Sequence, residues 1–189
     1  MNISVEIGPG ASVLLHTCCA PCAGAIAEAL SQSGAGAAIF FSNSNITPRS
    51  EYDRRLAEVY RLAERFGLEV IEDEYDHDAW KEAVRGLEDE PERGGRCLQC
   101  FRYRLSRAAA CASERGFDTL TTALASSRWK SLEQVDEAGR EACAAVQGVQ
   151  WWGRNWRKGG GQVRRDEINR EMSFYNQTFC GCEYSNKKI

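Results

Sequence analysis

Short apolar segments alternate along this sequence with longer stretches whose apolar residues recur at helical spacing. The apolar segments predict five strands, over residues 12–15, 37–41, 68–71, 118–124 and 149–152. The intervening and following stretches predict helices over 22–32, 51–66, 79–84, 97–115, 132–146 and 164–175. Because the strands look buried on both faces and helices separate them, we expect a Rossmann-like α/β fold. Its parallel sheet of about five strands would carry helices on both sides.

Length and composition indicate one globular domain. The chain has 189 residues, of which 43% are hydrophobic and 27% are charged. We therefore expect a single domain over 1–189, with the informative motifs between about 12 and 185. The sequence lacks both a run of apolar residues long enough to span a membrane and the pattern of a signal peptide. We expect a cytoplasmic protein that does not associate with membranes.

The carboxyl edge of the predicted sheet is where a ligand site is expected, because parallel α/β sheets bind ligands there. The first strand leads into Cys18 and Cys19, and the second leads into Asn43 and Asn45. The fourth strand ends near 125–127. No glycine-rich phosphate loop follows the first strand, so binding of ATP or a nicotinamide cofactor is not expected.

Nine cysteines are the strongest indication of chemistry, because thiols stay reduced in the cytosol and clustered ones there serve metals or redox reactions. Seven of them form three tight groups: Cys18, Cys19 and Cys22; Cys97 and Cys100; Cys180 and Cys182. Seven thiols exceed the four that one zinc ion takes, whereas an iron–sulfur cluster on four would leave three for a second function. We favour iron–sulfur and keep zinc as the alternative.

The remaining cysteines and the two later groups have distinct settings. Cys111 and Cys143 lie inside predicted helices among alanines and are expected to be small buried apolar residues. The 97/100 pair starts a predicted helix, where the helix dipole stabilises thiolates. The 180/182 pair flanks a glycine that allows a tight reversal, so it would form a reactive disulfide or clamp a second metal.

Four motifs, in this order, resemble the QueH-type epoxyqueuosine reductases. They are LHTCCAPC at 15–22, FSNSNITP at 41–48 followed by EY at 51–52, RCLQCF at 96–101 with RL at 104–105, and CGCEYS at 180–185. The resemblance covers nearly the whole chain. It implies a cytosolic enzyme that reduces epoxyqueuosine in tRNA to queuosine, a deoxygenation that consumes two electrons and two protons. An electron donor that the sequence does not identify would be required.

The resemblance also implies two neighbouring metal centres. Cys18, Cys19, Cys97 and Cys100 would bind a [4Fe–4S] cluster.

The second centre would use Cys180 and Cys182, which hold a single metal ion or form a redox-active disulfide without it. Some relatives carry an aspartate where this chain has Cys22, so Cys22 would be the third ligand of this second metal. A thiolate there makes the ion iron- or zinc-like. We count these three cysteines as catalytic, together with Tyr184, a candidate proton donor alongside a metal-bound water.

Four polar residues are candidate substrate contacts, each with a plainer alternative. Asn43 and Asn45 would bind substrate or form a turn. Arg96 would contact a phosphate or the cluster, or stay in a solvated loop. Lys130 would bind a phosphate or be a surface lysine. His16 is expected to be a hydrogen-bonded core residue.

A basic segment at 148–170 is a candidate RNA surface despite the net charge of −3. It carries six basic and two acidic residues, interleaved with Trp151, Trp152 and Trp156. Basic charge beside aromatic rings suits RNA with unstacked bases, although some of these tryptophans must be core. Two other functions stay open: a thiol–disulfide oxidoreductase without a cluster, and a zinc-stabilised RNA-binding module without catalysis.

Overall fold

A parallel sheet organises the computed structural model, which describes residues 3, 5, 7–8 and 10–185. Its strands are β1 (Ser12–Thr17), β2 (Gly36–Phe41), β3 (Glu69–Glu72), β4 (Thr119–Thr122) and β5 (Gln150–Trp151). All neighbouring strands pair in parallel in the order β3-β2-β1-β4-β5, so strand order reverses at β1. The expected α/β fold with a five-stranded parallel sheet is confirmed.

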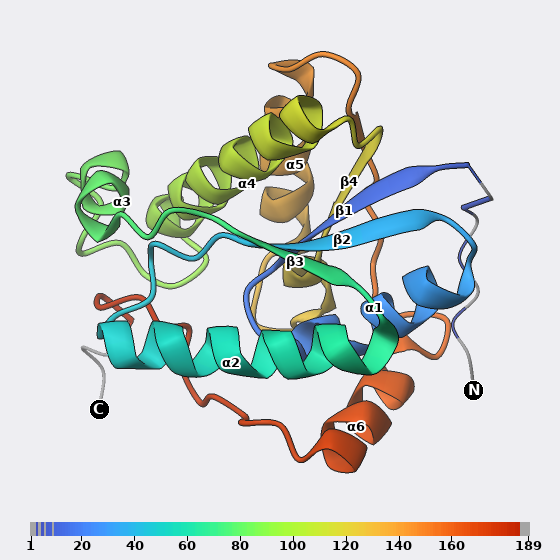
Figure 1. The fold of residues 1–189 in the computed structure, drawn as a ribbon. Helices are drawn as coiled ribbons and strands as arrows, with labels where there is room; N and C mark the ends of the chain where they lie inside the picture. The colour runs from blue at the N-terminus through green and yellow to red at the C-terminus, as the bar shows by residue number, and fades with distance from the viewer. Residues whose placement is uncertain (1–2, 4, 6, 9, 186–189) are drawn as a thin grey trace.

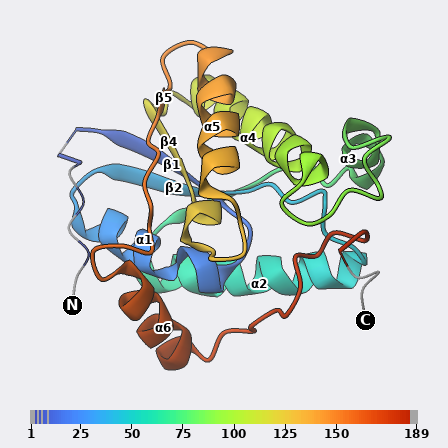
Figure 2. The ribbon, with the colours of Figure 1, turned by 180° about the vertical axis from the view of Figure 1, so that it is seen from behind.

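Helices cover both faces of this sheet (Figures 1 and 2). They are α1 (Ala20–Gln32), α2 (Arg49–Phe66), α3 (His77–Ala83), α4 (Gly95–Arg115), α5 (Leu132–Ala144) and α6 (Gly161–Met172), with a 3₁₀ turn η1 (Ala123–Ser126). Helices α1 and α2 pack on one face and α4 and α5 on the other, while α6 packs outside α1. The short α3 packs against α4 beyond the carboxyl ends of the strands.

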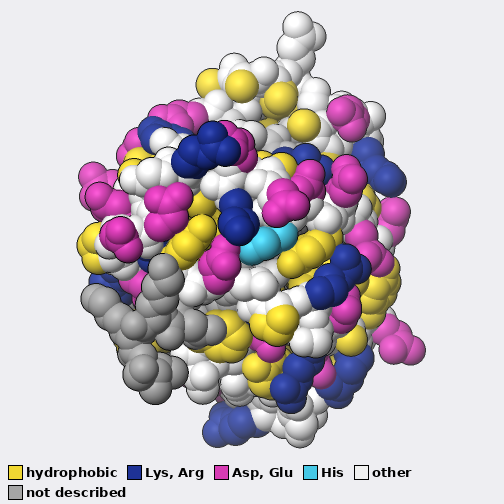
Figure 3. Space-filling model, turned by 90° about the vertical axis from the view of Figure 1, so that its left-hand side faces the viewer, with side chains coloured by type: hydrophobic (Ala, Val, Ile, Leu, Met, Phe, Trp, Pro, Cys, Tyr) yellow, Lys and Arg dark blue, Asp and Glu magenta, His cyan; other side chains and the backbone are white. Residues whose placement is uncertain are grey.

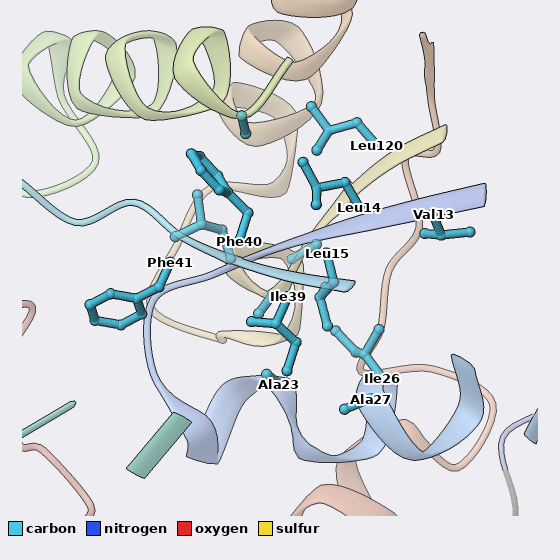
Figure 4. Packing of buried hydrophobic residues seen from close by; sticks show 14 of the residues in the cluster. Val13, Leu14, Leu15, Ala23, Ile26, Ala27, Ile39, Phe40, Phe41 and Leu120 are labelled. Atoms are coloured by element: carbon cyan, nitrogen blue, oxygen red, sulfur yellow. The ribbon is translucent and has the colours of Figure 1, made fainter. Parts of the chain in front are cut away.

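The core is built from strand residues that alternate between these two helical layers (Figure 4). Leu14 and Phe40 point toward α4, whereas Leu15 and Ile39 point toward α1. All four are almost completely buried. The strands are therefore apolar on both faces, as the sequence pattern predicts.

Small residues bring α1 and α6 close together. A Cβ atom on Gly24 would lie 3.0 Å from the Ile168 side chain, so only glycine fits without displacement. The long tail after α6 then returns along α2 to the carboxyl edge of the sheet (Figure 2).

Several predicted boundaries differ from the observed ones by two or three residues. The predicted strand 118–124 stops at Thr122, because the Thr122 hydroxyl accepts the Leu124 amide over 3.1 Å and starts the 3₁₀ turn. The tail helix begins and ends three residues earlier than predicted, at 161 and 172. The helix predicted over 22–32 begins at Ala20 in the structure, two residues earlier, because Pro21 is favoured in the first turn of a helix. None of the described helices is long and apolar enough to cross a membrane.

Candidate metal centre

Three cysteines gather at the junction of β1 and α1. Cys19 is the residue that caps the start of α1, Cys18 precedes it, and Cys22 lies in the first turn. The Sγ atoms of the three all lie within 4.8 Å of one another, and those of Cys18 and Cys19 are 3.8 Å apart. Thiols at a helix N-terminus face the positive end of the helix dipole, which favours thiolates.

These three thiols share protons. Hydrogen bonds from Cys19 and Cys22 lower the pKa of Cys18 well below its usual value. Hydrogen bonds with Cys18 and with Cys22, together with burial, raise the pKa of Cys19. The pKa of Cys22 is raised to about 12, mainly by its hydrogen bond to Cys18 and by burial. A bound cation would replace the shared protons, so this donor set fits a thiophilic metal or an iron–sulfur cluster.

Cys180 joins this site from the C-terminal tail. Lys130 Nζ donates to its Sγ over 2.8 Å. Burial alone would raise the pKa of Cys180, but the nearby charges of Lys130 and Arg104 outweigh burial and lower it. Cys18, Cys97 and Cys100 are each close enough to interact electrostatically with Cys180 or with Lys130.

The tail that carries Cys180 is fastened by α2. Arg55, 2% exposed, donates to the backbone oxygens of Phe179 and Cys180 over 3.2 and 2.9 Å. Its guanidinium also pairs with Glu51 over 2.7 Å. Gly181 follows with φ of +98°, and its carbonyl accepts the Thr47 amide over 2.9 Å. These contacts hold the tail over the carboxyl edge of the sheet.

The three remaining clustered thiols come from α4 and the tail. Cys100 and Cys182 are both 7% exposed and share a small apolar cluster with Trp80. Cys97 is half-buried and accepts a hydrogen bond from the Arg93 amide over 3.2 Å. Burial raises the pKa of each of these thiols, that of Cys182 to about 12. None of the nine cysteines is in a disulfide in this structure.

Within the described chain, only one group of three metal-binding side chains is tight, and it comprises Cys18, Cys19 and Cys22. Cys22 thus lies with the two expected cluster ligands rather than beside Cys182. The assignment of four thiols to a cluster and three to a second metal stays a prediction.

A cavity of about 780 Å³ opens beside these thiols. Its lining comes from the residues that follow β1 and β2, from α1, α4 and α6, from the loop before α5 and from the tail. It includes Cys18, Cys22, Asn43, Asn45, Arg104, Lys130, Gln177 and Cys180. Cys19, Cys97, Cys100 and Cys182 do not line it. Three of the four expected substrate contacts are therefore at the cavity wall.

The two asparagines have different environments. Asn43 donates to the Thr17 carbonyl over 2.9 Å and accepts from Arg104, so both ends of its amide are paired. Asn45 is 1% exposed, and its Oδ1 atom has no hydrogen-bond partner among the described residues. An unpaired buried oxygen at a cavity wall suits contact with a substrate N–H group.

Two further candidates lie outside the cavity. Arg96 is 3% exposed and donates to the carbonyls of Glu88, over 2.8 Å, and Glu90, so it fastens the loop before α4. Tyr184 stacks on Trp80 with ring centroids 5.9 Å apart. Their roles toward substrate stay predictions.

The segment 148–170 is less available to RNA than its composition suggests. Arg164 donates twice to Glu28, each over 2.7 Å, and also pairs with Glu167. Trp156 is 2% exposed and donates to Thr121, so it is a core residue. Of this segment, Gln162, Arg165, Asp166 and Asn169 reach the cavity.

Three neighbours of the site were not expected from the sequence. Arg104 belongs to the third motif, and in the structure it lies at the cavity wall beside Asn43. Arg55 holds the tail, and its place four residues after Glu51 was the available signal. Gln177 donates to Cys19 Sγ over 2.7 Å, which no sequence pattern indicated.

Figure 3 looks onto the end of the molecule where α3 lies, and basic and acidic side chains are interspersed there with hydrophobic ones. His77 on this end contacts the tail through Glu183, 3.3 Å away. This end of the molecule therefore carries positive and negative side chains side by side and not a continuous patch of one charge.

Comparison with known proteins places the chain in a family. The family described as "Epoxyqueuosine reductase QueH" matches residues 13–188. A protein of that name from Histophilus somni is 46% identical over 173 residues, covering 92% of this chain and 71% of the relative. One from Acinetobacter baylyi is 45% identical (92% and 79% covered), and one from Thermotoga maritima is 34% identical (92% and 90% covered). The chain therefore belongs to the epoxyqueuosine reductase QueH family.

Proposed function

We propose that this protein reduces epoxyqueuosine to queuosine in tRNA. The reaction removes the epoxide oxygen as water, with two electrons and two protons, and leaves an alkene. The observation that carries the proposal is the cavity of about 780 Å³ whose wall holds Cys18, Cys22 and Cys180 together with polar side chains able to bind a base. The names of the relatives support the same reaction. With tRNA as substrate, we expect the protein to act in the cytoplasm.

The thiols divide between electron transfer and substrate activation in this proposal. Cys18, Cys19, Cys97 and Cys100 would hold a [4Fe–4S] cluster, which supplies single electrons from an external donor when bound. Cys22, Cys180 and Cys182 would hold the second ion, iron or zinc. The closeness of Cys22 to Cys18 and Cys19 supports two adjoining centres.

The polar side chains at the cavity would bind and orient the substrate. Asn45 Oδ1 would accept an N–H group of the base, because no described residue satisfies this oxygen. Arg104 would hold Asn43 in place by its hydrogen bond to the side-chain oxygen. Lys130 would keep positive charge beside Cys180 and so stabilise its thiolate. Tyr184 remains a proposed proton donor, acting from the tail that carries Cys182.

Anaerobically purified protein tests the proposal. We expect broad visible absorption, bound iron and sulfide, and conversion of epoxyqueuosine to queuosine in tRNA when a chemical reductant is supplied. Cys18→Ala should lose all three, whereas Cys143→Ala, a buried cysteine on α5 away from the site, should keep them. A colourless wild-type protein that reduces disulfides would indicate a thiol–disulfide oxidoreductase. Bound zinc without turnover would indicate an RNA-binding module.

Variants at Cys22 test the second centre. Cys22→Ala should lose one metal ion per chain, keep the visible absorption and lose most turnover. Cys22→Asp should restore much of the metal content and of the turnover, since a carboxylate is also a metal ligand. Full metal content and turnover in Cys22→Ala would exclude Cys22 from the second centre.

A further inference from the structure

The loop between η1 and α5 carries two adjacent residues with opposite environments. Lys130 reaches inward and donates to Cys180 Sγ. Trp129, its neighbour, is 64% exposed, the highest value among the exposed large hydrophobic side chains of the described chain. Both residues line the same cavity. Trp129 therefore lies where the cavity meets solvent.

The backbone under Trp129 is held firmly. Arg93 donates from its guanidinium to the carbonyl of Arg128 over 2.7 Å and to that of Trp129 over 3.1 Å. Gln134, on α5, in turn donates to the Arg93 carbonyl over 2.9 Å. A ring fixed at its backbone and left in solvent contributes little to folding, because it buries little apolar surface.

Positive charge lies beside the ring. The guanidinium carbon of Arg128 lies 4.7 Å from the centroid of the Trp129 ring, and Arg128 itself is exposed. Arg165 also lines the cavity and is paired with Asp166 over 3.2 Å. Glu92 contributes one further acidic group to the lining. The aromatic ring and the guanidinium that borders it make a flat, cationic surface at the cavity mouth.

We propose that Trp129 and Arg128 form a stacking platform for a nucleotide next to the one that reacts. The inference rests on the proposed function. A base that belongs to an RNA chain can enter the cavity only if its neighbours in the chain stay at the mouth. Unpaired bases stack on aromatic rings and on guanidinium planes, and adjacent phosphates pair with arginine. The platform therefore recognises a chain, not only the base being reduced.

Binding measurements with and without the ring test this platform. The probe is tRNA carrying epoxyqueuosine, titrated onto the metal-loaded protein without reductant, so that no turnover occurs. Trp129→Ala should weaken binding by at least about fivefold, since stacking on one aromatic ring typically accounts for that much or more. Trp129→Phe should keep most of the affinity. Wild-type tryptophan fluorescence should be quenched on binding, and Trp129→Phe should lose much of that quenching.

The salt dependence of binding separates the contribution of the Trp129 ring from that of the Arg128 charge. Arg128→Gln should weaken binding and lower the slope of log affinity against log salt by about one, as loss of one phosphate contact does. Trp129→Ala should leave the slope unchanged. Tyr60→Ala is the matched control, because Tyr60 is an exposed aromatic residue on α2 that is absent from the cavity wall. Its affinity and slope should equal those of wild type.

The outcomes distinguish the two proposals. A wild-type protein that does not bind the tRNA overturns the proposed function and this inference with it. Wild-type binding with equal affinity in Trp129→Ala overturns the platform alone. Normal tRNA affinity in Trp129→Ala, with turnover lost only when a protein donates the electrons, would assign the surface to the electron donor and likewise overturn the platform.

Discussion

The middle of the sheet and its carboxyl end are equally buried but chemically opposite. Within β1, Val13, Leu14 and Leu15 are fully buried and apolar. The next two residues, His16 and Thr17, are just as buried and polar. The change occurs within a single strand, so burial alone does not distinguish core from site.

Side-chain hydrogen bonds make the polar end possible. His16 bonds to the Thr122 hydroxyl over 2.8 Å and to the Ser42 carbonyl over 3.3 Å, which links β1 to the ends of β4 and β2. Asn43 donates to the Thr17 carbonyl over 2.9 Å. Most buried polar groups in proteins are paired, and these bonds hold three strand ends in fixed positions around the thiols. The apolar middle supplies stability, and the polar end supplies a preformed site.

The largest stability effect is expected in the apolar middle. Leu15→Ala should lower the free energy of unfolding by about 2–5 kcal/mol, because it removes buried methyl groups and leaves a cavity between β1 and α1. Denaturant titration measures this loss. Metal content per folded chain should stay at the wild-type value. A loss of metal without a loss of stability would break the distinction between the two regions.

The fold was predictable because its pattern is local. Runs such as 12–15 and 37–41 are apolar on both faces, and only a covered parallel sheet buries both. The end of β4 was not predictable from periodicity, because Leu124 continues an apolar run. The hydrogen bond from the Leu124 amide to the Thr122 hydroxyl ends the strand there and starts the 3₁₀ turn.

The next largest effect is expected at the polar end. Arg104→Met removes the donor to the Ser42 carbonyl, 3.0 Å away, and to Asn43 Oδ1. The Ser42 carbonyl keeps its hydrogen bond to His16, but Asn43 Oδ1 is left unpaired, and an unpaired buried oxygen costs about 1–3 kcal/mol. Unlike Leu15→Ala, this variant should also lose metal content, because it removes positive charge that favours the Cys18 and Cys180 thiolates. Denaturant titration and metal analysis on the same samples compare the loss of stability with the loss of metal in the two variants. Normal metal content would show that Arg104 is structural only.

The sequence predicts the residue types of the site, but it predicts only some of the side chains that contact its cysteines. Cysteines close in sequence, such as Cys18 and Cys19, must be close in space. The contacts of Cys180 with Lys130 and of Cys19 with Gln177 join residues 50 and 158 positions apart. Such pairs depend on how the tail crosses the sheet edge, which no local pattern encodes.

A smaller effect is expected where the tail docks. Gly181 has φ of +98°, and a Cβ atom there would lie 3.0 Å from Ile46 and 3.2 Å from the Arg55 guanidinium. Gly181→Ala should cost about 1–3 kcal/mol through backbone strain and displace the two flanking thiols. Turnover should therefore fall by more than the loss of stability accounts for. Gly67→Ala is the control, since Gly67 has φ of +65° with no atom within 4 Å of the added Cβ and lies at the end of α2. Equal loss of turnover in both variants would contradict a specific role for tail docking.

The effect that is smallest at neutral pH is a pH dependence that belongs to the polar end alone. Burial, followed by the charge of Arg104, lowers the pKa of His16 to about 3. The unfolded chain binds a proton at His16 below its ordinary pKa of about 6.5, whereas the folded chain stays neutral there until about pH 3. This contribution to stability is therefore complete above pH 6.5 and declines as pH falls, by up to about 1.4 kcal/mol per pH unit.

His16→Gln isolates that contribution, because glutamine keeps a hydrogen-bonding amide but does not titrate in this range. The difference in unfolding free energy between wild type and His16→Gln should be constant above pH 7. Below that pH it should shift against wild type, with a slope of about one proton between pH 6 and pH 4. Denaturant titrations at several pH values measure this slope. A difference that does not change with pH would mean that His16 titrates in the folded protein at its ordinary pKa, and it would contradict the lowered pKa.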